Sequence, residues 1–167
     1  MPGLSISGIF KSRSLKSHAL FYYFMARIKI DIPGSFSFRT TIPIRITDIN
    51  YGGHVGNDTI LSLLHEGRVQ FLNHFGYQEL NIDGMGLIMS DVAIDFKKEA
   101  FYGDHLNIFI SAGEFTKVTF ELYYKLETEV GEKTVVIAVA KTSMVCYDYS
   151  NKKITSLPHG IKEKLSA

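Results

Sequence analysis

Residues 47–68, TDINYGGHVGNDTILSLLHEGR, concentrate side chains that can move a proton or hold a carbonyl oxygen. Asp48 and Glu66 each carry a carboxylate that can act as a general base or nucleophile. His54 lies between them and can donate a hydrogen bond or tune a neighbouring carboxylate. Asn50 can orient a water or a carbonyl, but its amide cannot act as a base near pH 7. The segment therefore predicts acid–base chemistry on a bound carbonyl group, with two alternative carboxylates.

Glycines stand directly before a helical pattern in the same stretch. The start of a helix offers free N–H groups and a positive dipole end, and glycine lets a ligand approach the backbone closely. Gly53, Val55, Gly56 and Asn57 can therefore form a substrate-binding site, with main-chain amides near 55–57 holding a carbonyl oxygen. The alternative is a flexible turn followed by a helix cap.

The periodicity of residues 57–75 predicts one long amphipathic helix. Asn57 or Asp58 is the expected N-cap, and Gly76 the expected C-cap. The apolar positions that recur at spacings of 3, 4 and 7 are Ile60, Leu61, Leu64, Phe71, Leu72 and Phe75.

The segments on either side of this helix read as strands. Residues 35–46, interrupted by Pro43, predict an edge strand, and four further segments alternate or run apolar: 87–96, 105–112, 117–130 and 134–149. The turn around Gly131 predicts a hairpin, and the apolar run of the last strand predicts cover on both faces. We expect an α+β fold in which one antiparallel sheet wraps one long helix.

Composition narrows the class of protein. The chain has 167 residues, 46% of them hydrophobic, and a formal net charge of +1. Such a charge argues against a nucleic-acid partner, and the apolar runs are too short to span a membrane. The single cysteine, Cys146, fits a cytoplasmic protein. We expect no metal and no cofactor, because the remaining histidines lack paired metal-ligand spacing: His18, His65, His74, His105 and His159.

The first 24 residues differ in character from the rest. Basic residues precede the short apolar patch ALFYYFM, which barely reaches the length of a signal-peptide core. We expect residues 1–24 to be a disordered extension or an upstream mis-start, with natural translation beginning at Met25. Residues 25–167 are then one domain.

Residues 36–165 resemble the 4-hydroxybenzoyl-CoA thioesterase-like hotdog family. The resemblance rests on residues 46–77, where the family has an Asp-x-Asp, a Gly-His-Val-Asn-Asn-type turn and a Glu-x-Ala-Arg on the helix. It is supported by "FYGDHLNI" at 101–108 and by the Pro-led tail "NKKITSLPHGIKEKL". It implies a hotdog fold and hydrolysis of an acyl-CoA or acyl carrier protein thioester to acid and thiol.

The resemblance also implies roles for particular residues. Related thioesterases carry an acid on this helix, so Glu66 is the first candidate for the catalytic carboxylate and Asp48 the second. Many members place the catalytic acid at the second position of Asp-x-Asp, where this chain has Asn50. Gly56 likewise replaces the first Asn of the family's Asn-Asn pair, while Asn57 keeps the second. We expect Arg68 to anchor the helix to the loop through Asp48 or Glu66.

Assembly and alternative functions follow from the same resemblance. Hotdog domains close their open sheet edge by pairing, so a homodimer or homotetramer is implied, with active sites at the interface. The acyl chain would run along Leu61, Leu64 or Phe71 of one subunit and Ile88 or Met89 of the other. Two alternatives remain: a non-catalytic protein that binds acyl-CoA or acyl carrier protein, favoured by Asn50, and an enoyl-thioester hydratase.

Overall fold

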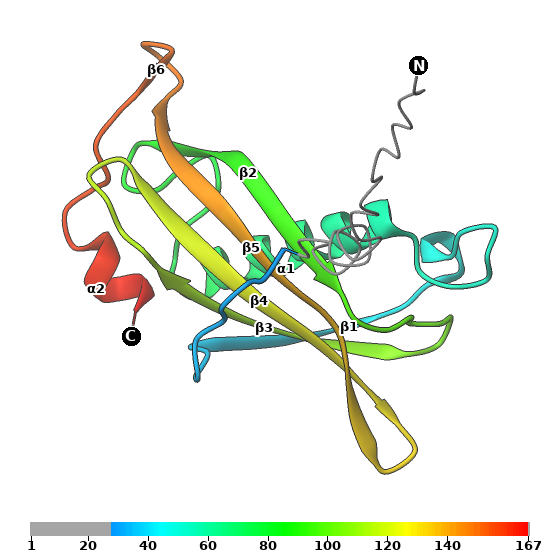
Figure 1. Cartoon of the computed structure of the whole chain (residues 1–167). Helices are drawn as coiled ribbons and strands as arrows, with labels where there is room; N and C mark the ends of the chain where they lie inside the picture. The colour runs from blue at the N-terminus through cyan, green and yellow to red at the C-terminus, as the bar shows by residue number, and fades with distance from the viewer. Residues whose placement is uncertain (1–27, 167) are drawn as a thin grey trace, which may run out of the picture.

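The computed structural model describes residues 28–166 of the chain (Figure 1). The expectations for residues 1–24 and for a start at Met25 lie outside these residues. The elements follow in the order β1 (Phe38–Pro43), a short 3-10 helix (Ile46–Asp48), α1 (Asn57–His74), β2 (Gly86–Phe96), β3 (His105–Gly113), β4 (Thr119–Val130), β5 (Lys133–Asp148), β6 (Lys153–Ile154) and α2 (Ile161–Leu165).

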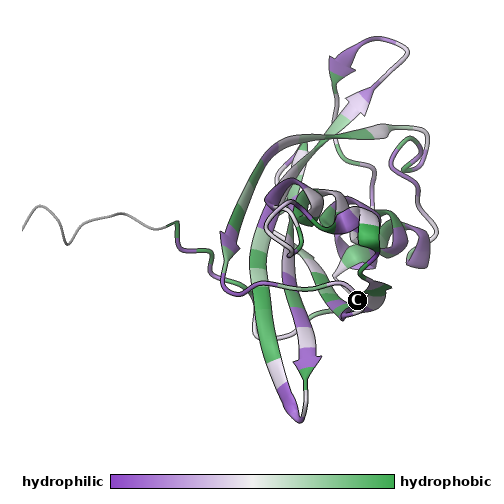
Figure 2. Cartoon of the chain, turned by 90° about the vertical axis from the view of Figure 1, so that its right-hand side faces the viewer, coloured by the Kyte–Doolittle hydropathy of each residue, from purple (hydrophilic) through white to green (hydrophobic). Residues whose placement is uncertain are grey.

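The strands form one antiparallel sheet in the order β1-β3-β4-β5-β2, with β6 paired to β5. The sheet curves around α1, which lies in its concave side (Figure 2). The predicted α+β class with one sheet wrapped around one long helix is confirmed. Pro43 ends an edge strand as expected, and the hairpin turn between β4 and β5 has Gly131 at a φ of +62°.

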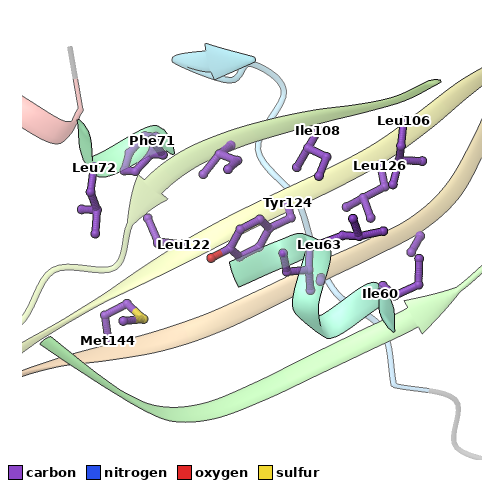
Figure 3. Close-up of a cluster of buried hydrophobic side chains, with 14 of the residues drawn as sticks. Ile60, Leu63, Phe71, Leu72, Leu106, Ile108, Leu122, Tyr124, Leu126 and Met144 are labelled. Carbon is purple, nitrogen blue, oxygen red and sulfur yellow. The ribbon is translucent and has the colours of Figure 1, made fainter. Parts of the chain in front are cut away.

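The core lies between α1 and the sheet. Alternate residues of β3 and β4 point toward the helix, as their sequence alternation predicts. Figure 3 shows this cluster, in which Tyr124 lies among aliphatic side chains of α1 and the strands. The β5 segment is buried without interruption from Ile137 to Ala140, in agreement with the expected cover on both faces.

The ends of α1 differ in how well the sequence predicted them. The N-cap is Gly56, not Asn57 or Asp58, and no side chain caps the helix there. At the other end, Gly76 adopts a φ of +76°, and its N–H donates to the carbonyl of Asn73 while that of Tyr77 donates to Leu72. This is a Schellman motif, which confirms Gly76 as the helix terminator.

A close approach to β3 fixes the rotation of α1. A Cβ atom at Gly67 would lie 3.1 Å from Cδ1 of Ile110 and 3.3 Å from Cγ2 of Ile108. This side of the helix therefore packs directly on the sheet, and residues one position away point toward its flanks. None of the helices in residues 28–166 is long and apolar enough to cross a membrane.

Candidate functional site

A pocket of about 510 Å³ beside β1 contains both predicted carboxylates, Asp48 and Glu66. Thr59, Ser62 and Glu66 line one side of it because spacings of three and seven residues place them on one stripe of α1. β1 and the segment that follows it contribute Thr41, Ile42, Pro43 and Arg45 to the lining.

Glu66 is exposed and has an incompletely engaged carboxylate. Nε2 of Gln70, one helical turn further on, donates to its Oε1 at 2.7 Å. Within residues 28–166, the hydrogen bonds of Glu66 engage only this oxygen, and the residue lines the pocket. A carboxylate with one oxygen held and the other free can accept a proton from a water in the pocket.

Asp48 is engaged much more completely. Its carboxylate accepts hydrogen bonds from Arg45 through the backbone N–H (2.8 Å), Nε (3.2 Å) and Nη2 (3.0 Å). Only 4% of the residue is exposed. The side-chain hydrogen bond with Arg45, aided by the backbone N–H and opposed by burial, holds the pKa of Asp48 below its ordinary value. These contacts favour a structural role for Asp48 in the turn.

His54, Val55 and Asn57 lie in a different pocket, of about 460 Å³, together with the end of β2. Nine residues separate Asn57 from Glu66, which is about 180° around an α-helix. The two therefore face opposite sides of α1. In this second pocket, Nδ1 of His54 lies 3.6 Å from Oε1 of Glu99. The structure thus divides the predicted site between two pockets.

Asn50 stabilises the turn between these pockets. Its Oδ1 accepts the backbone N–H of Gly52 at 2.7 Å, and its carbonyl accepts that of Gly53 at 3.1 Å. Gly53 has a φ of +82°, a conformation that other residues rarely adopt. These contacts are those of an Asx turn.

The amides at the helix start differ from the predicted set. The N–H of Val55 donates to the carbonyl of Ala100 at 2.9 Å, and that of Gly56 to Asp48 at 3.2 Å. Neither is therefore free to hold a substrate oxygen. The first turn leaves the N–H groups of residues 57–59 without intrahelical acceptors, and Gly56 supplies no side chain to cap them. Of these three residues, Thr59 lies on the same stripe of α1 as Glu66.

Arg68 does not contact Asp48 or Glu66, so that prediction is wrong. Its Nε donates to Oε1 of Glu79 at 2.5 Å, and Nε2 of His65 lies 2.9 Å from Oε2 of the same carboxylate. These residues face the flank of α1 next to β2, because Nη1 of Arg68 reaches Sδ of Met89 at 3.8 Å.

The predicted acyl contacts also need correction. Leu64 and Phe71 are completely buried in the core, so they cannot line an open acyl site. The apolar walls available near Glu66 are Ile42, Pro43 and Leu63.

Sequence reasoning missed Arg45, Thr59 and Gln70, all of which line the pocket of Glu66. The helical spacing of Thr59 and Gln70 from Glu66, seven and four residues, was a usable signal for both. Within residues 28–166, no group of three or more His, Cys, Asp or Glu side chains could hold a metal ion.

Comparison with known proteins identifies the family. The chain belongs to the thioesterase-like superfamily, whose family model matches residues 44–165. This membership supports a thioester hydrolase in general and confirms the family resemblance. The fold is the hotdog fold of these proteins.

Individual relatives agree with this assignment. A curated relative from Aquifex aeolicus (strain VF5), named "Putative esterase", is 26% identical over 132 residues, which are 78% of this chain and 97% of the relative. The crystal structure of a 1,4-dihydroxy-2-naphthoyl-CoA thioesterase from Synechocystis is similar with a TM-score of 0.68 at 22% identity, covering 77% of this chain and 94% of that one. A thioesterase superfamily structure from Jannaschia sp. CCS1 has a TM-score of 0.69 at 15% identity, covering 81% and 89%.

Proposed function

We propose that this protein is an acyl-CoA thioesterase that hydrolyses its substrate in the pocket beside β1, with Glu66 as the catalytic carboxylate. The observation that carries the proposal is the shared stripe of α1: Glu66 and Thr59 line the same pocket, and the helix has no side-chain cap. The carboxylate of Glu66 and Thr59, whose hydroxyl and first-turn N–H are candidate oxyanion donors, thus border one space.

The spacing along the helix suits a thioester. Seven residues place the Cα of Glu66 about 10 Å from that of Thr59 along the axis. Helical side chains lean toward the N-terminus, over roughly the preceding turn of about 5 Å. Both residues line the pocket, so a thioester bound along this stripe would lie between the carboxylate and the first turn of the helix.

The reaction follows from these positions. Glu66 takes a proton from water as the water oxygen attacks the thioester carbon. The resulting oxyanion accepts the N–H of Thr59, with the helix dipole adding to its stabilisation. The tetrahedral intermediate then collapses, the carbon–sulfur bond breaks, and the thiolate leaves and takes up the proton. The products are the free acid and the thiol.

The loop supports this site without entering the chemistry. Asp48 fixes the turn through Arg45 and accepts the N–H of Gly56 through its carbonyl, which sets the start of α1. The acyl group would contact Ile42, Pro43 and Leu63. We assign CoA rather than a carrier protein as the thiol, because the name of the Synechocystis relative specifies a CoA thioester.

A non-catalytic protein that binds acyl thioesters is the second candidate. Its support is Asn50, which stands where many relatives have the catalytic acid and whose side-chain oxygen is engaged by Gly52. The enoyl-thioester hydratase has less support, because His54 contacts Glu99 and lies in the other pocket from Asp48.

We further propose that the protein forms a homodimer through β2, which ends the strand order and exposes apolar side chains. Met89, Val92 and Phe96 are each 38% exposed. Pairing of two β2 strands would cover them and join two sheets. Because Phe96 lines the pocket of His54, that pocket would lie near the interface, whereas the pocket of Glu66 lies beside β1 at the other end of the strand order.

The test is release of thiol from a panel of short, long and aromatic acyl-CoAs. Glu66→Gln keeps the side-chain shape and removes the base, so we expect kcat to fall about 10²- to 10⁴-fold with the fold intact. Asp48→Asn should weaken folding more than chemistry. Glu132→Gln, in the β4–β5 turn, is the matched control and should behave as the wild type. Binding of acyl-CoA without turnover by the wild type would establish the second candidate instead.

A further inference from the structure

We infer that Thr40 and Gln70 position the carboxylate of Glu66, so that a residue of β1 outside the pocket controls its catalytic carboxylate. The inference rests on the proposed function of Glu66. It adds two positioning residues that the loop-and-helix segment 47–68 does not contain.

Two hydrogen bonds link the three side chains in series. Oγ1 of Thr40 donates to Oε1 of Gln70 at 2.5 Å, and Nε2 of Gln70 donates to Oε1 of Glu66 at 2.7 Å. Thr40 is half-buried on the face of β1 that also carries Phe38 and Ile42, both packed against the core next to α1. The series therefore ties the helix stripe to the edge strand.

The chemistry of the groups fixes the direction of both bonds. An ionised carboxylate only accepts hydrogen bonds, so the NH₂ of Gln70 must face Glu66. The carbonyl oxygen of Gln70 then faces Thr40, whose hydroxyl is the donor. A rotated amide would place its oxygen against the carboxylate and its NH₂ against the threonine hydroxyl. The hydroxyl of Thr40 thus helps to select the one amide orientation that supports Glu66.

Holding one oxygen of Glu66 orders a flexible side chain. A glutamate on an exposed helix surface samples several rotamers, and only some of them direct Oε2 at a bound thioester. The charge-assisted bond from Gln70 favours one arrangement. Loss of the series should therefore lower kcat and leave KM nearly unchanged, since Thr40 is not among the residues that line the pocket.

Kinetics of four variants test this. Thr40→Val keeps the side-chain shape without the hydroxyl, and we expect kcat to fall about 5- to 20-fold with KM within twofold of the wild type. Thr40→Ser, which keeps the hydroxyl, should recover most of kcat. Gln70→Leu should lower kcat at least as much, and the Thr40→Val/Gln70→Leu double variant no further than Gln70→Leu alone. Thr134→Val, at the exposed start of β5, is the control for a threonine-to-valine change.

A measurement without substrate checks the same contacts. In the wild type, one side-chain NH₂ proton of Gln70 should resonate downfield in the ¹H–¹⁵N spectrum, because it bonds to a carboxylate. That shift should be lost in Thr40→Val and retained in Thr40→Ser.

The outcomes separate this inference from the proposed function. Three results would each overturn the positioning role. They are a wild-type kcat in Thr40→Val, a double variant whose loss of kcat is the product of the two single losses, and a Gln70 side-chain resonance that is unchanged in Thr40→Val. If Glu66→Gln retains full turnover, the proposed function fails whatever the Thr40 variants do. If Glu66→Gln loses turnover while Thr40→Val keeps the wild-type kcat, the positioning role is refuted and the proposed function stands.

Discussion

Replacement of Glu79 by alanine tests the ion pair on the other flank of α1. Arg68 is only 5% exposed, and Glu79, in the segment between α1 and β2, is its charged partner at 2.5 Å. Its other polar contacts there are Sδ of Met89, a weak acceptor, and the uncharged hydroxyl of Tyr124. Glu79→Ala therefore leaves a buried guanidinium without a charged partner.

The magnitude follows from burial. Removing one partner of a fully buried ion pair costs about 3–5 kcal/mol. Because 24% of the Glu79 side chain is exposed, water can partly replace it, and we expect a loss of about 2–3 kcal/mol in the free energy of unfolding. His65→Ala removes a partner whose side chain is 55% exposed and should cost less than about 1 kcal/mol.

The assay is urea unfolding, monitored by circular dichroism, of each single variant and of Arg68→Met/Glu79→Leu. The double variant replaces both charges with apolar groups and should lie within about 1 kcal/mol of the wild type. A cost below about 0.5 kcal/mol for Glu79→Ala would refute the reasoning, as would a double variant no more stable than Glu79→Ala.

The pH dependence gives a second check on the same variant. Burial alone would raise the pKa of Glu79, but the hydrogen bonds from Arg68 and His65 outweigh it and lower that pKa. The contribution of Glu79 to stability is therefore complete above its ordinary pKa, near 4.5, and is lost as the pH falls through the lowered folded-state value. Between pH 7 and pH 3, Glu79→Ala should lose less stability than the wild type.

Two further predictions concern the loop and the sheet edge. Arg45→Ala removes the main cause of the lowered pKa of Asp48, so the variant should be less stable than the wild type at pH 7 and should lose less stability between pH 7 and pH 3, as measured by urea midpoints; an acid-induced loss as large as that of the wild type would contradict this role of Arg45. Val92→Lys on β2 should yield a monomer by size-exclusion chromatography with light scattering, while thiol release stays within twofold of the wild type. A dimer that persists in this variant would argue against pairing through β2. A monomer without activity would place catalysis at the interface.

The strands and the long helix were predictable because their signals are local. Alternation in 105–112 and 117–130 gave the inward faces of β3 and β4, and the apolar spacing of 57–75 gave α1. The C-terminal glycine of the helix was equally readable, since a left-handed residue there favours Gly76.

The helix N-cap and the partners of polar side chains were less predictable, because tertiary contacts decide both. Asn and Asp are preferred N-caps, yet α1 begins after Gly56, where the carbonyl of Asp48 accepts the backbone N–H. The partner of Arg68 lies in the segment after the helix, and Thr40 is 30 residues from Gln70. No spacing rule within 47–68 connects these pairs.

The division of the predicted site has a different cause. Closeness in sequence suggested that Asn57 and Glu66 share a site, but a helix turns by about 100° per residue. Nine residues bring the two to opposite flanks, while seven bring Thr59 to the flank of Glu66. The same helical periodicity that predicts the core positions would have selected Thr59 as the helix-start residue that shares a site with Glu66.

The replacement of the expected loop acid by Asn50 is consistent with hydrolysis once the roles of loop and helix are separated. Asp48 accepts three hydrogen bonds from Arg45, and its carboxylate is held ionised in a turn. A base held in this way has little capacity to take a proton from water. Glu66 has one oxygen engaged by Gln70 and lines a pocket with apolar walls and an uncapped helix start. In the proposed mechanism, the loop therefore sets the position of α1, and the helix supplies the catalytic carboxylate.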